Sequence, residues 1–335
     1  MNQIGFHFVD NQYTDAQVNA HFGLLNDCKP ACINVLGGAQ YKEALSFAKR
    51  AKQAFPEMRV IFRHYRDGGD DGMHTRLSAR DWWDKIGKLY IGTGLTILSD
   101  NESMAADLRP YAAWQAEIMR YAGDAGVGIA YNRFATHNPS KAQFGQLNAA
   151  YIAAADYDLG LHTCSPNVYF TPGNYDGLKY PGYHAEQGYV LGLRLSLTIG
   201  EFAILRDIRD AHHGWHSMTM DGAFYANRLI TLAKDALPGI PVCVYSIGQW
   251  PINADTFSLD KSVIDVIQKY PMPLTLPIPT PPIPDPPEPP PAQSRYVTIE
   301  RAEHIRLMQR EKDYAALRGI MDAMIEQYEQ HKEGE

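Results

Sequence analysis

Two glutamates that follow strand-like segments are the residues of this sequence best suited to paired acid–base chemistry. Glu102 comes after the short apolar run 95–98, and Glu201 lies near the end of the apolar run 193–203. Short runs of apolar, β-branched residues are typical of buried strands. A carboxyl group at the exit of such a strand is costly to bury without a partner or a task. Because the two glutamates are far apart in the sequence, only the fold could bring them together.

Two carboxyl groups that face each other across a cleft can break a glycosidic bond. At a separation of about 5–5.5 Å, one attacks the anomeric carbon while the other donates a proton to the leaving oxygen and later activates water. Both carboxyl groups start from a pKa near ~4.3, so their surroundings must separate the two values. Trp250 and Tyr169 could supply an aromatic wall for a sugar ring. This chemistry needs neither a metal nor an organic cofactor.

The elements that would position these residues alternate between strands and helices. Apolar, strand-like runs occur at 4–10, 31–38, 59–67, 94–102, 127–134, 158–165, 193–203 and 240–248. Helix-like stretches separate most of them; in "YKEALSFAKRAKQAF", Ala44, Phe47, Ala48 and Ala51 fall on one helical face. Eight such units over about 250 residues predict an α/β fold, a (β/α)₈ TIM barrel. The alternative is a doubly wound open sheet, but "FVDNQYTD" after the first strand lacks the expected glycine-rich phosphate turn.

Catalytic groups of such barrels lie at the carboxyl ends of the strands. The sequence therefore directs attention to the polar and aromatic residues expected there: Asp10, Asn11, His64, Asn101, Glu102, Asn132, His162, Glu201 and Trp250. His7 on the first strand is predicted to point into the barrel as a structural residue. Arg63, Arg66 and Asp67 are predicted to form an ion-pair network at the rim. The loops 68–82 and 166–189 are expected to wall the cleft.

The pairs Asn101-Glu102 and Gly200-Glu201, the second followed by Phe202, resemble the signature of clan A glycoside hydrolases. That resemblance covers residues 1–270 and implies a TIM barrel with catalytic glutamates on strands four and seven. It implies Glu102 as acid/base, Glu201 as nucleophile and Asn101 as partner of the sugar 2-hydroxyl. It also implies Trp250, after strand eight, as a sugar platform.

Further residues resemble family 5 of this clan in part. His162 resembles the first residue of the His-x-Tyr motif after strand six, although Cys164 stands where the tyrosine is expected. The arginine often found near the end of strand two is absent from "INVLGG". His64 resembles a strand-three histidine, and a register shift of one residue would replace it with Arg63 or Tyr65. The resemblance is therefore to a divergent member, nearest in style to family 5.

Other interpretations of these residues remain open at this point. A glutamate at a strand end is most often exposed or ion-paired, and Arg206 or Arg209 could pair with Glu201. A second hypothesis is thus a non-catalytic carbohydrate-binding or structural barrel. A third is a metal-dependent hydrolase that uses a histidine loop, formed by His212, His213 and His216. No acidic or cysteine ligand completes a metal-binding spacing there, so a solvated loop is favoured.

The sequence divides into three parts. Residues 1–270 form the predicted barrel, residues 271–293 a proline-rich linker, and residues 294–335 a helical tail. Twelve of the 22 prolines lie in 271–291, which excludes a helix or a central strand and favours an extended polyproline spacer.

The tail carries a coiled-coil-like seam on a helix expected from about Thr298 to Gln330. Its members are Ile305, Met308, Leu317, Met321, Met324 and Tyr328. A helix of this length is marginal alone, so it needs a partner surface. Folding back onto the barrel is one option. Because the spacer would hold the helix away from the barrel, a homo-oligomer formed through this tail is favoured.

Composition limits the partners. The 335 residues are 45% hydrophobic with a formal net charge of −7, which argues against a nucleic-acid partner and suits a neutral carbohydrate. The four cysteines are too few for a disulfide framework. Since no run reaches the ~18 apolar residues of a membrane span, no membrane partner is expected. No signal peptide is evident, so a cytoplasmic location in the producing cell is expected; release by lysis or by another route stays open.

Overall fold

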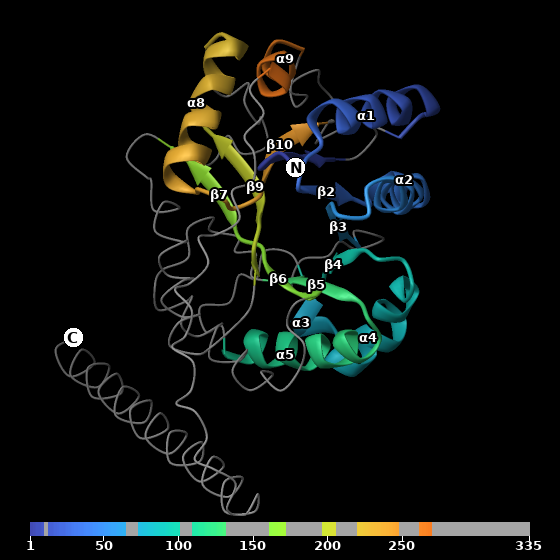
Figure 1. The fold of residues 1–335 in the computed structure, drawn as a ribbon. Helices are drawn as coiled ribbons and strands as arrows, with labels where there is room; N and C mark the ends of the chain where they lie inside the picture. Colours follow the sequence, from blue (N-terminus) through green and yellow to red (C-terminus); the bar gives the residue numbers. More distant parts are fainter. Residues whose placement is uncertain are drawn as a thin grey trace, which may run out of the picture. The chain divides into compact units, whose positions relative to one another are not determined.

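The computed structural model describes residues 1–9, 13–64, 73–100, 109–131, 161–171, 196–205, 220–247 and 261–269. Within these residues, ten strands form one sheet in which every pair of neighbours is parallel (Figure 1). The strands are β1 Ile4–Phe8, β2 Cys32–Leu36, β3 Arg59–Arg63, β4 Thr96–Leu98, β5 Gly128–Tyr131, β6 Thr163–Cys164, β7 Asn167–Phe170, β8 Ser196–Leu197, β9 Ile199–Ile204 and β10 Val242–Ile247.

The sheet closes on itself. β1 pairs with β2 on one side and with β10 on the other, so the first and last strands are neighbours. From β1 the order runs through β5 to β6, which pairs with β8; after Thr198 the chain continues as β9, which pairs with β10. β6 and β7 are likewise two pieces of one run, and β7 pairs with β9. β6 and β7 make up one barrel strand, or stave, and β8 and β9 make up another. The ten strands thus form the eight parallel staves of a TIM-type barrel, and a doubly wound open sheet is excluded.

Every strand-like run of the sequence contains an observed strand, but the sixth extends further than predicted. It was expected to end at residue 165, whereas the chain continues past Ser165 and Pro166 into β7, which ends at Phe170. Proline lacks the N–H that a sheet ladder uses, so Pro166 interrupts the strand without ending it. The predicted strand end at His162 is therefore wrong, because His162 precedes β6. Likewise, the predicted loop 166–189 begins with a strand.

The helices lie around the outside of the sheet (Figure 1). They are α1 Asp15–Cys28, α2 Tyr41–Ala54, α3 Met73–Arg76, α4 Ala79–Lys85, α5 Arg109–Asp124, α8 Gly222–Ala236 and α9 Lys261–Lys269, with the short 3₁₀ helices η1 Gly38–Gln40 and η2 Gly87–Tyr90. The predicted face of α2 is confirmed, since its four apolar members are at most 1% exposed. The predicted loop 68–82 is corrected, because α3 and the start of α4 fall inside it.

Local sequence signals fix where several helices begin. At the start of α1, Thr14 and Gln17 form a capping box in which each side chain binds the backbone N–H of the other residue. Ser78 caps α4 through the N–H of Asp81, and Asp221 caps α8. Each such cap satisfies a backbone donor that would otherwise lack a partner, which stabilises a helix by about 1 kcal/mol.

The core lies between the barrel and the helices. Phe8 of β1 and Phe47 of α2 are fully buried with their ring centroids 5.1 Å apart, a contact of the kind that contributes about 1.5–3 kcal/mol per side chain. The first two strands approach so closely at Gly5 that a Cβ atom would lie 1.8 Å from the carbonyl oxygen of Cys32. This position therefore requires glycine. All four cysteines are buried, and none of them forms a disulfide.

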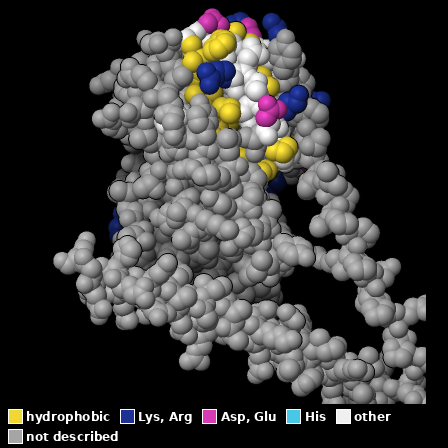
Figure 2. Space-filling model, turned by 90° about the vertical axis from the view of Figure 1, so that its left-hand side faces the viewer, with side chains coloured by type: hydrophobic (Ala, Val, Ile, Leu, Met, Phe, Trp, Pro, Cys, Tyr) yellow, Lys and Arg dark blue, Asp and Glu magenta, His cyan; other side chains and the backbone are white. Residues whose placement is uncertain are grey.

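The chain separates into two compact units, Met1–Pro277 and Ile278–Glu335. The predicted linker 271–293 and the tail helix lie outside the described residues. None of the helices that the structure describes is long and apolar enough to cross a membrane. In Figure 2, the described part of the face shown mixes hydrophobic side chains with acidic and basic ones, without a stripe of one charge.

Candidate active site

Glu201 occupies the inner face of the barrel. It is the third residue of β9, and all six residues of that strand are buried. The alternate residues Phe202 and Ile204 belong to the core under the helices. Because successive side chains of a strand point to opposite faces, Glu201 and Ala203 face the barrel interior. Glu201 is only 4% exposed, so its carboxylate depends on protein groups for hydrogen bonds.

Arg63 contacts this carboxylate from across the barrel. Its Nη1 lies 3.4 Å from Oε1 of Glu201, and both side chains are largely buried. Arg63 ends β3, which is separated from β9 in the sheet by β2, β1 and β10. The contact therefore spans the interior. From the sequence, Arg206 and Arg209 were residues that could pair with Glu201; both lie outside the described residues, and the structure adds Arg63 as a partner.

Two further groups meet Glu201, one from the adjacent strand β7 and one from β1, which lies on the far side of β10. The hydroxyl of Tyr169 on β7 donates a hydrogen bond to Oε2. Nδ1 of His7 on β1 lies 3.6 Å from Oε1. The two carboxylate oxygens thus face different partners, with the guanidinium on one and the phenol on the other. Both contacts favour the ionised carboxylate and hold it in one orientation.

An apolar cluster lies on the same side of the barrel as these polar groups. The Tyr245 ring lies 5.2 Å from the His7 ring and 6.0 Å from the Tyr169 ring. The cluster as a whole contains Val9, Leu36, Tyr169, Ala203, Leu205 and Tyr245. Low polarity around a charged pair strengthens the attraction between its members. Glu201 is therefore an oriented, buried carboxyl group at the inner wall of the barrel.

The structure does not gather all the predicted site residues at Glu201. Tyr169 is there, although it comes from a strand and not from the expected loop. His64 bonds elsewhere: its Nδ1 lies 2.5 Å from the hydroxyl of Tyr90 in η2 and 3.2 Å from that of Tyr41 in α2. The anticipated shift by one residue is thus observed, with Arg63 on the inner side.

His162 lies at the opposite end of its stave from the expected place. Its Nδ1 accepts a hydrogen bond from the backbone N–H of Ile129, at 3.0 Å, and the side chain is fully buried. Its position before β6 does not fit a motif that follows the sixth strand. Asn101, Glu102 and Trp250, together with His212, His213 and His216, lie outside the described residues. Among the residues that are described, no three metal-ligating side chains cluster.

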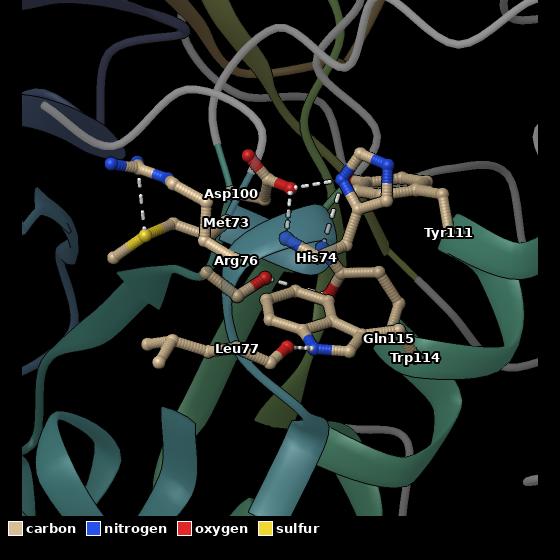
Figure 3. Close-up of polar contacts among 9 residues, drawn as sticks. Met73, His74, Arg76, Leu77, Asp100, Tyr111, Trp114 and Gln115 are labelled. Atoms are coloured by element: carbon tan, nitrogen blue, oxygen red, sulfur yellow. Dashed lines mark hydrogen bonds and ion pairs between the residues drawn. The ribbon is translucent and has the colours of Figure 1, made fainter. Parts of the chain in front are cut away.

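A second polar pair, which sequence reasoning missed, lies just beyond β4 (Figure 3). Oδ2 of Asp100 lies 2.6 Å from Nδ1 of His74, and it accepts a second hydrogen bond from the His74 backbone N–H at 3.0 Å. The His74 ring packs 5.1 Å from that of Tyr111. Burial raises the pKa of Asp100, while the hydrogen bonds from His74 and Met73 oppose that rise. The sequence signal was the carboxylate at the exit of a buried strand; its partner lay in a predicted loop.

Comparisons with known proteins give a distant likeness in fold alone. No model of a protein family matches the sequence, and no curated protein is similar to it in sequence. An endo-1,4-beta-D-mannanase from Thermotoga petrophila RKU-1 is 10% identical over 81% of this chain and 99% of its own, with a TM-score of 0.48. An aldo/keto reductase from Brucella melitensis is 11% identical over 80% and 94%, with a TM-score of 0.39.

A type I 3-dehydroquinate dehydratase from Clostridium difficile is 12% identical over 80% of this chain and 93% of its own, with a TM-score of 0.40. These three proteins carry different activities in their names. Since fold does not imply function, the chemistry has to be argued from the side chains around Glu201.

Proposed function

We propose that this protein is a retaining glycoside hydrolase that cleaves β-glycosidic bonds of an oligo- or polysaccharide. Glu201 is the proposed nucleophile and Glu102 the proposed acid/base. The observation that supports this most is the buried Glu201 carboxylate, which Arg63 and Tyr169 hold through its two oxygens inside a parallel barrel. A nucleophilic carboxylate must be ionised and must keep one orientation, and these two contacts favour both.

The reaction would proceed by double displacement. A Glu201 oxygen attacks the anomeric carbon as the glycosidic C–O bond breaks, and Glu102 gives its proton to the leaving oxygen. In the second step Glu102 takes a proton from water, and the resulting hydroxide attacks the anomeric carbon and releases the Glu201 carboxylate. Arg63 would keep Glu201 charged in the free enzyme. The Tyr169 hydrogen bond would hold Oε2, and Oε1, which Arg63 contacts in the free enzyme, would be the oxygen that attacks the sugar.

The remaining roles are proposals that follow from the same hypothesis. Asn101 would bind the sugar 2-hydroxyl, and Trp250 would carry a sugar ring on its face. We propose a carbohydrate as the partner of the barrel and a homo-oligomer formed through the tail. Several barrels on one stalk would gain avidity for a polymeric substrate without any new contact.

One observation favours a second candidate, a non-catalytic carbohydrate-binding or structural barrel. Both oxygens of Glu201 already have protein partners, which also suits a structural ion pair. The two candidates differ in one respect: a nucleophile forms a covalent bond with the sugar, whereas a structural carboxylate does not.

The test is a screen of chromogenic glycosides and polysaccharides, followed by variants on the best substrate. Glu201→Gln and Glu102→Gln should each lower turnover at least about a thousandfold while the fold persists, because the change is nearly isosteric. Glu43→Gln, at an exposed position of α2, is the matched control and should keep wild-type activity. A slow fluorinated glycoside should leave a glycosyl adduct on Glu201, detectable by mass spectrometry.

Near-wild-type activity in both active-site variants would refute the assignment. Retained glycan binding with no turnover across the screen would instead favour the non-catalytic barrel.

A further inference from the structure

The chain leaving β4 is held at two consecutive residues. The Ser99 hydroxyl donates a hydrogen bond of 2.6 Å to Oε1 of Gln115 on α5, and the Gln115 amide in turn donates to the Tyr111 hydroxyl at 2.9 Å. The next residue, Asp100, binds both the ring and the backbone of His74 on α3. Ser99 and Asp100 are at most 1% exposed. The exit of this short strand is therefore tied to two helices by buried side chains.

The geometry of the His74–Asp100 pair is specific. Oδ2 accepts both hydrogen bonds from His74, while Oδ1 is buried and has no hydrogen-bond partner among the residues that the structure describes. The His74 ring is confined by the Tyr111 and Trp114 rings, at 5.1 and 6.4 Å (Figure 3). The Trp114 indole is itself fixed by a 2.8 Å hydrogen bond to the Leu77 carbonyl. Neither the imidazole nor the carboxylate can rotate without losing these contacts.

The pair also costs stability, which argues that it has a task. A buried carboxyl group loses hydration that the hydrogen bonds from His74 and Met73 restore only in part. An apolar pair of similar size at this place would avoid that loss. The residues that follow Asp100 in the chain are Asn101 and Glu102, the proposed sugar ligand and the proposed acid/base.

We propose that His74 and Asp100 form a positioning pair that fixes the path of the chain as it leaves β4, and with it the placement of Asn101 and Glu102. This inference rests on the proposed function, because it gives Glu102 its task. Neither member of the pair touches the substrate in this proposal. A displacement of about 1 Å in a catalytic group is enough to lower turnover about a hundredfold.

Three variants separate positioning from mere packing. His74→Leu removes the ring donor and retains bulk. His74→Asn restores a donor, because its side-chain amide nitrogen takes the place of Nδ1. Asp100→Asn removes the charge. The matched control is Asp84→Asn on α4, whose carboxylate forms exposed ion pairs with Arg80 and Lys88.

The first readout is hydrogen exchange of the full-length protein, followed by mass spectrometry, and it needs no activity. His74→Leu should speed exchange in peptides covering 99–108 and leave the peptides of α8 unchanged, and His74→Asn should restore the wild-type rate. Asp84→Asn should leave 99–108 unchanged. Wild-type exchange of 99–108 in both His74→Leu and Asp100→Asn would overturn the inference, as would equal defects in His74→Asn and His74→Leu.

The second readout is steady-state kinetics on the best substrate. His74→Leu should lower kcat about 10- to 100-fold with a smaller change in KM, because the acid/base and not the sugar platform is misplaced. His74→Asn should recover most of the loss. An unchanged kcat together with faster exchange would overturn the role in catalysis. If the wild-type protein cleaves no glycoside at all, the proposed function fails, whereas the exchange data still decide whether the pair fixes residues 101–108.

Discussion

Replacing Arg63 with methionine tests whether the cross-barrel pair at Glu201 is a real electrostatic interaction. At the 3.4 Å separation of Nη1 and Oε1, the gross attraction at an effective dielectric constant of about 20 is about 5 kcal/mol. The desolvation of both groups offsets much of this attraction. Removing the guanidinium alone leaves a buried carboxylate with the Tyr169 hydroxyl and the His7 ring near it. We expect Arg63→Met to lower the free energy of unfolding by about 3 kcal/mol or more.

The assay is a double-mutant cycle followed by urea unfolding at neutral pH. In the Glu201→Gln background Arg63 has no carboxylate to pair with, and Arg63→Met leaves no unpaired carboxylate behind, so the same change should cost at least about 2 kcal/mol less than in the wild type. The methionine side chain fills the space of the aliphatic part of the arginine side chain, which limits how much lost packing contributes to the change in the free energy of unfolding. Additive effects, with a coupling below about 0.5 kcal/mol, would refute the account of Glu201 as an anion held by Arg63.

Two further predictions follow from Asp100 and from the tail. Burial raises the pKa of Asp100, so the folded protein favours the protonated carboxyl group. The contribution of Asp100 to the free energy of unfolding is therefore fully present below its ordinary pKa of about 4, and it is lost as pH rises through the raised pKa. Urea unfolding from pH 3.5 to 7 should therefore show Asp100→Asn gaining stability relative to the wild type as pH rises; a difference independent of pH would contradict this. Light scattering at micromolar concentration should show association of the full chain but not of residues 1–277; a monomeric full chain would rule out the proposed tail bundle.

The barrel could be predicted from the sequence because its signal is repeated. Few folds have eight strands that alternate with helices over about 250 residues, and the TIM barrel is one of them. The pairing of β1 with β10, which closes the sheet, agrees with the predicted barrel. The sixth stave was misjudged for a local reason. Pro166 resembles a strand terminator in a single sequence, but only the neighbouring strand β9, which pairs with Asn167–Phe170, shows that the ladder resumes.

The inner partner of Glu201 on β3 could not be chosen from the sequence. Four of the five residues of β3 are buried, on both faces, so there is no alternation of polar and apolar side chains to set the register. From the sequence, Arg63 and His64 were thus equally good candidates for the barrel interior. A register shift by one residue moves a side chain from the barrel interior to the face covered by the helices. Only the cross-barrel distance distinguishes Arg63, at Glu201, from His64, at Tyr90 and Tyr41.

The polar interior of this barrel bears on function more than on fold. Branched apolar residues usually fill such interiors, yet here the inner wall carries Arg63, Glu201 and His7, and Asn34 donates to the Gly200 carbonyl at 3.0 Å. Arg63, His7 and Glu201 come from three different strands and meet at one carboxyl group, so a change in any of them disturbs the contacts of the others. Such networks add rigidity only when their members are satisfied. A carboxylate held from several strands keeps one rotamer, and this is the property that a nucleophile requires and that an apolar core of equal volume would not provide.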